Sequence, residues 1–135
     1  MFAAMHNPKA AYAKAGVETG VETADPHKLV LMLFEGALLA LASASLHMKR
    51  NEDAADVARK GEAISKAINI IDNGLKASLD QEAGGELAGR LAALYDYMSA
   101  RLLQANLQNQ PAALDEVSHL LAELKGAWVQ IGNKP

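Results

Sequence analysis

The segment from Leu29 to Leu46 limits what this chain can fold into more than any other part of the sequence. It is almost continuously apolar over 18 residues, and its polar side chains are Glu35, Ser43 and Ser45. A helix that is apolar on all sides is either buried on all sides or presents apolar surface to a partner. Eighteen residues are marginal for crossing a bilayer and a carboxylate is costly in lipid, so we expect no membrane insertion.

The composition favours an all-α fold in a single domain. Half of the 135 residues are apolar but only 4% are aromatic, and Ala and Leu dominate, which is typical of closely packed helices. The net charge of -3 and the absence of a Lys/Arg stripe argue against nucleic acid as a partner. The chain has no cysteine, and its N-terminus lacks the basic start and apolar core of a secretory signal. We therefore expect a cytoplasmic protein.

Helical spacing of apolar residues predicts four helices, at about residues 26–49, 54–79, 86–107 and 111–130. The first begins at Asp25-Pro26, a capping residue followed by a proline at the first helical position. Short turns between helices of this length favour an antiparallel up-down four-helix bundle over residues 25–131. Residues 1–24 are expected to form a mobile N-terminal arm, with Tyr12 as its docking anchor, and residues 132–135 a tail.

No arrangement of residues indicates catalysis, a metal or a cofactor. The four histidines stand in separate predicted elements. Glu116 and His119 form one Glu-x-x-His pair, half of the pattern of di-iron bundles, but no second pair exists and both residues flank an inward-facing seam. A phosphotransfer role for His47 lacks a supporting acid or base. We expect a protein that is not an enzyme.

The surplus apolar surface of the first helix then has three interpretations: cover by the N-terminal arm, self-association of the bundle, or a groove for a partner. The predicted third helix adds a second apolar surface at Leu102-Leu103. A weakly docked arm is easily displaced, so the first and third interpretations are compatible. The implied partner is an amphipathic or disordered chain that folds in the groove.

Several stretches of the sequence also resemble the FliS family of flagellar secretion chaperones. The resemblance extends from about Tyr12 to Trp128, and its most specific part is GGELA followed by LYDYM. The matching stretches are ADPHKLVLMLFEGAL (24–38), KAINII (66–71), SLD (78–80), GGELA (84–88), LYDYM (94–98), Arg101-Leu102, ANL (105–107), Glu116-Val117, Leu120-Leu121 and Ala127-Trp128.

The resemblance implies a cytosolic export chaperone that binds the disordered C-terminal segment of flagellin in apolar grooves and so prevents premature polymerisation. It implies that Tyr12 matches the family's arm tyrosine, and that other flagellar export or regulatory proteins are possible partners. The alternative is a structural bundle that self-associates as a weak dimer. The expected contact residues are Tyr12, Leu31, Met32, Leu38, Leu39, Leu79, Leu87, Leu91, Tyr95, Leu103 and Asn106.

Overall fold

A computed structural model describes residues 25–132 of the chain as an all-α bundle. The α-helices are α2 (Pro26–Arg50), α3 (Ala54–Ile70), α4 (Gln81–Gln108) and α5 (Pro111–Gly132). A single π-helical turn, η2 (Ile71–Lys76), continues α3. The described part of the chain contains no strand, which confirms the predicted fold class.

Side-chain caps set the starts of three of these helices. Asp25 accepts a hydrogen bond from the backbone N–H of Lys28, and Asp53 accepts one from Asp56 N–H. Asp80 accepts from two N–H groups at the start of α4. Such caps satisfy donors that have no partner within the helix. At the other ends, Asn51 and Asn109 adopt left-handed backbone angles, which stop α2 and α4.

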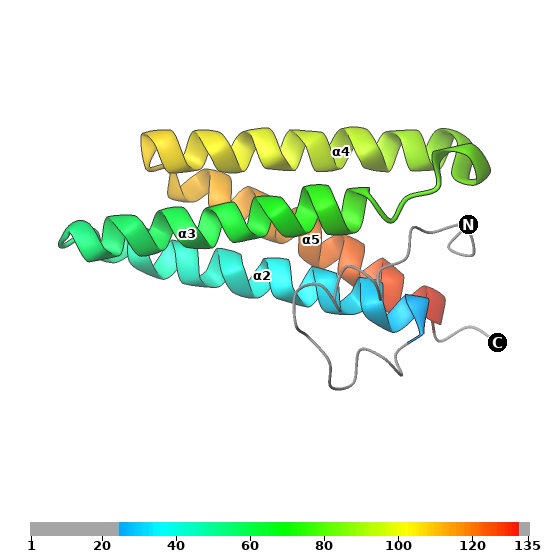
Figure 1. Ribbon diagram of the computed structural model, residues 1–135, viewed down its shortest axis with the longest axis horizontal. Coiled ribbons are helices and arrows are strands. Elements are labelled where there is room, and N and C mark those ends of the chain that lie inside the picture. The colour runs from blue at the N-terminus through cyan, green and yellow to red at the C-terminus, as the bar shows by residue number, and fades with distance from the viewer. Residues whose placement is uncertain (1–24, 133–135) are drawn as a thin grey trace.

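The helices run alternately up and down, so that consecutive helices are antiparallel neighbours (Figure 1). Helix α2 packs against α3 and α5, whereas α4 packs against α5, α3 and η2. Helices α2 and α4 therefore lie on opposite corners of the bundle. The core between them is aliphatic; its largest fully buried side chains include Leu29, Leu41, Ile64, Met98 and Leu121.

The connection between α3 and α4 differs from the expectation. The sequence predicts one regular helix to residue 79 and a Gly-Gly hinge at 80–85, but α3 widens into the π turn η2 at Ile71. Helix α4 already begins at Gln81, and its glycine hinge is a kink inside the helix at Gly85, where φ is 57°. Asp80 forces the early start, because its carboxylate caps the first turn ahead of the kink.

Helix α2 is long and apolar enough to cross a membrane by length and composition, with a mean hydropathy of 2.1 in its most apolar window. Core helices of soluble proteins meet the same criterion. One face of α2 packs into the bundle core through residues such as Leu33, Ala37, Leu41 and Ala44. The other face carries apolar side chains that the bundle leaves exposed.

Candidate partner-binding surface

An exposed apolar row runs along the outer face of α2. Met32, Leu39 and Leu46 follow one another at intervals of seven residues and are 36%, 72% and 49% exposed. Residues seven apart lie on the same side of a helix, about two turns from one another. Leu31 and Leu38 are half-buried beside this row and pack against the core. Four of the predicted contact residues are thus neighbours on one helix face.

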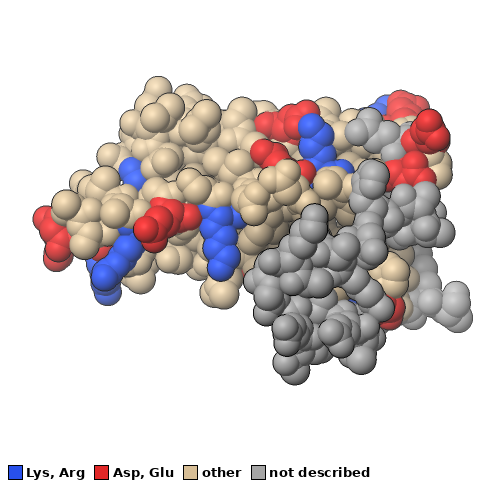
Figure 2. Space-filling model, viewed as in Figure 1, with Lys and Arg blue, Asp and Glu red and all other residues tan. Residues whose placement is uncertain are grey.

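A cleft of about 280 Å³ separates this part of α2 from α3. Its floor is apolar and small, with Ala40 on α2 and Ala63 on α3. Its α3 side carries three charged residues, Arg59, Glu62 and Lys66. In Figure 2, charged side chains of alternating sign follow one another along α3. The cleft thus joins an apolar α2 side to a charged α3 side.

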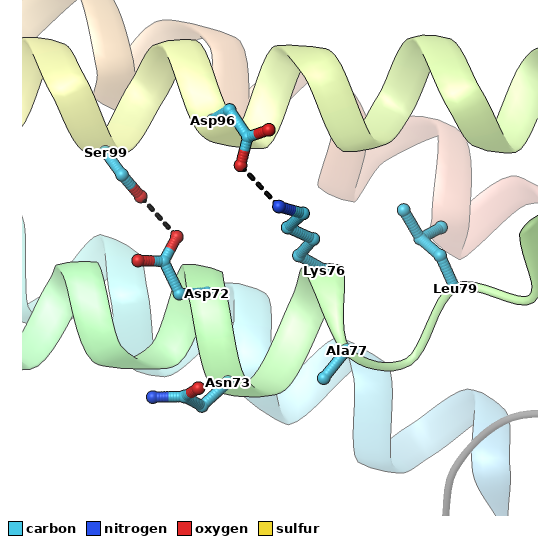
Figure 3. A pocket seen from close by; sticks show the side chains of 7 residues that line it. All are labelled: Asp72, Asn73, Lys76, Ala77, Leu79, Asp96 and Ser99. Carbon is cyan, nitrogen blue, oxygen red and sulfur yellow. Dashed lines mark hydrogen bonds and ion pairs between the residues drawn. The ribbon is translucent and has the colours of Figure 1, made fainter.

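A second cleft, of about 530 Å³, lies between the π turn and α4 (Figure 3). Two polar contacts cross it, each of 2.6 Å: Lys76 Nζ donates to Asp96 Oδ1, and Ser99 Oγ donates to Asp72 Oδ1. The hydrogen bond to Asp96 raises the pKa of Lys76. Leu79 lines the end of this cleft.

Helix α4 carries the second apolar surface. Leu87 is 61% exposed near its beginning, and Leu103 and Leu107 are 53% and 75% exposed near its end. Leu91 and Asn106 are half-buried between these ends and their neighbours. In Figure 2, the surface over the last turns of α4 is a broad stretch almost without charge.

The structure places the remaining predicted contact residues differently. Leu79 and Tyr95 are only 8% and 4% exposed and belong to the core. Burial raises the pKa of the Tyr95 phenol, so this side chain stays neutral. Tyr12 lies outside the described residues. A partner on the surface of the bundle therefore meets the leucines of α2 and α4 before it meets Leu79 or Tyr95.

Sequence reasoning missed two exposed leucines that continue these surfaces. Leu46 extends the seven-residue row of Met32 and Leu39, and Leu107 follows Leu103 by one turn. Both spacings were readable in the sequence. The exposure was not, because it depends on which face of each helix its neighbours cover.

Polar contacts between α4 and α5 use the residues once considered for metal binding. Glu116 accepts hydrogen bonds from Tyr97 Oη (2.5 Å) and Arg101 Nε (2.8 Å), and these bonds lower its pKa. His119 instead pairs with Glu123 on the exposed side of α5. Within residues 25–132, no group of three His, Cys, Asp or Glu side chains is placed to hold a metal ion.

Comparison with known proteins gives one consistent result. The family model of the flagellar protein FliS matches residues 8–135. The flagellar secretion chaperone FliS of Salmonella typhimurium is 56% identical over 92% of this chain and 89% of its own length. The Escherichia coli protein of the same name is 51% identical over 87% of this chain and 84% of its own length. That of Bacillus subtilis is 36% identical over 94% and 87%.

Proposed function

The chain belongs to the FliS family, a family of chaperones and not of enzymes, and on this premise we propose that it is a cytoplasmic chaperone for flagellin. In this proposal it serves flagellar export by binding the disordered C-terminal segment of flagellin. The segment folds against the apolar surfaces of α2 and α4, and the bound flagellin cannot polymerise before secretion.

The observation that carries the proposal is the position of the two apolar surfaces. Their helices lie on opposite corners of the bundle, with α3 and α5 between them. A single rigid helix cannot contact both, whereas a disordered chain can pass around the bundle and fold locally on each surface. The two clefts beside α3 and η2 offer a route from one surface to the other.

The apolar residues also supply a suitable driving force. Burying one leucine completely contributes about 1.5–3 kcal/mol before the cost of ordering the partner is subtracted. Leu39, Leu103 and Leu107 are each more than half exposed, so most of that gain is still unrealised in the free bundle. We include Leu31, Met32, Leu38, Leu87, Leu91 and Asn106 in the proposed contact surface.

The proposal is tested by mixing the full chain with full-length flagellin and with flagellin lacking its C-terminal segment, followed by size-exclusion chromatography with light scattering. A one-to-one complex with the full-length protein alone is expected. Equal binding of both flagellins, or of neither, contradicts the proposal.

A further inference from the structure

The α2–α3 cleft contains two similar pairs of residues, each made of an exposed leucine on α2 and a cation on α3. The antiparallel register follows from Gly36, whose Cα faces the Ile70 side chain, so that paired residue numbers sum to about 106. In this register Leu39 lies across from Lys66, and both line the cleft. Leu46 lies one heptad further along α2, across from Arg59.

These two pairs repeat at the same interval on both helices. Leu39 and Leu46 are seven residues apart on α2, and Arg59 and Lys66 are seven residues apart on α3. Seven residues of helix span about 10 Å, so the pairs are two turns apart along the cleft. A helical ligand lying along the cleft therefore meets the same combination of apolar and basic groups twice.

The charges along the cleft make a definite pattern of positive, negative and positive at Arg59, Glu62 and Lys66. Among residues 25–132, none of these three side chains forms an ion pair with another residue. Other cations of the bundle are already paired, such as Lys76 with Asp96 and Arg101 with Glu116. The charges of the cleft are thus available to a ligand.

We propose that the α2–α3 cleft binds an amphipathic helix of a partner that carries an apolar residue next to an acidic residue, repeated once at an interval of seven. The apolar residues pack on Leu39 and Leu46, and the carboxylates pair with Lys66 and Arg59. A neutral or basic residue between the two acids faces Glu62. This inference rests on the proposed function, because it specifies the client segment that the α2 surface accepts.

The test uses two synthetic helical peptides of equal length, one with two Leu-Glu pairs seven residues apart and one with Leu-Lys pairs at the same positions. Fluorescence anisotropy with the full chain should show at least about tenfold tighter binding of the Leu-Glu peptide, since each exposed charge pair contributes only modestly. Raising the salt concentration should reduce this preference.

The decisive variant is the double charge reversal Arg59→Glu with Lys66→Glu, which should invert the preference in favour of the Leu-Lys peptide. The matched control reverses two cations outside the cleft, Lys28→Glu with Lys125→Glu, and should keep the preference for Leu-Glu. Circular dichroism verifies that both variants remain folded. An unchanged preference in the cleft variant overturns the inference.

Two further outcomes separate this inference from the broader proposal. If flagellin does not bind while the Leu-Glu preference and its inversion are observed, the client identity is wrong and the cleft assignment stands. If light scattering shows that the chain forms a dimer which the cleft variant dissociates, the occupant is a second copy, and the inference is overturned.

Discussion

Lys60 Nζ on α3 donates a hydrogen bond of 2.6 Å to Oδ1 of Asn109, the residue that ends α4. The same ammonium group donates a 3.0 Å bond to the backbone carbonyl of Asn106. Lys60 is only 6% exposed, so its charge is buried against the C-terminal end of α4, where the helix dipole favours a cation. This contact fixes the end of α4 that carries Leu103 and Leu107.

The variant Lys60→Met keeps the apolar stem but removes both hydrogen bonds. It should lower the free energy of unfolding by about 1–3 kcal/mol, because the Asn106 carbonyl loses its charged partner while remaining shielded from water. Urea denaturation measures the change. Lys66→Met, at an exposed position of the same helix, is the control and should change stability by less than about 0.5 kcal/mol. Equal effects of the two variants contradict the capping role.

Gly74 is required where the π turn approaches α2. A Cβ atom at this position would lie 2.8 Å from a methyl carbon of Leu33, which is itself only 8% exposed. Gly74→Ala should therefore lower the free energy of unfolding by about 1–3 kcal/mol through overpacking. Gly126→Ala on α5, where nothing lies within 4 Å, should instead be stabilising by up to about 1 kcal/mol.

A double variant separates this steric effect from a change in helix propensity. Leu33→Ala removes the atoms that a Cβ at residue 74 would meet, so Gly74→Ala should cost much less in that background. Thermal unfolding of the four variants of this cycle gives the coupling. Additive effects would mean that Leu33 is not what restricts residue 74.

Gly74 also illustrates how far the sequence predicts the structure. The apolar spacing, the capping residue Asp25 and the turn at Asn109-Gln110-Pro111 were sufficient for the all-α bundle. Gly74 was readable only as a bend or a close contact, and the sequence does not decide between them. The π turn depends on how α3 packs against α2, which is a tertiary effect.

The contact surface was predicted less completely than the fold. Leu39 and Leu103 stand out in the sequence as surplus apolar residues, and both are exposed. Tyr95 and Leu79 have the same residue types as a contact surface would need, yet they are buried, because the local pattern does not tell which flank of a helix its neighbours cover. The π turn between α3 and α4 further changes the register near Leu79.

Acid should weaken the connection between α2 and α3. His47 Nδ1 lies 2.9 Å from Asp56 Oδ1, and this hydrogen bond lowers the pKa of Asp56 below its ordinary value of 3.8. A carboxylate with a lowered folded-state pKa stabilises the fold above its ordinary pKa, and the stabilisation is lost as the pH falls through the folded value. Asp56→Asn should thus reduce stability at pH 7 and match the wild type at the lowest pH.

Urea denaturation at a series of pH values from 7 down to 2.5 measures this difference. The bonds from Tyr97 and Arg101 also lower the pKa of Glu116 below 4.5, so Glu116→Gln should give a similar convergence at low pH. Parallel stability curves for the wild type and Asp56→Asn over the whole range would exclude the proposed linkage.

The apolar row on α2 should affect client binding without affecting stability. Leu39→Ala removes a side chain that is 72% exposed, so the free energy of unfolding should change by less than about 0.5 kcal/mol. Its affinity for the flagellin C-terminal segment should fall about tenfold, which corresponds to about 1.4 kcal/mol. Ala42→Ser, on the same exposed side of α2, is a control for a small polar change. Unchanged affinity of Leu39→Ala would remove this row from the contact surface.

Isothermal titration calorimetry of the full chain with the isolated C-terminal segment of flagellin, repeated at several temperatures, tests the central claim most directly. We predict a one-to-one complex with a large negative heat-capacity change and an unfavourable entropy, as expected when a disordered chain folds on apolar surfaces. Absence of binding, or binding without a change in heat capacity, would contradict the claim that α2 and α4 form a surface on which this segment folds.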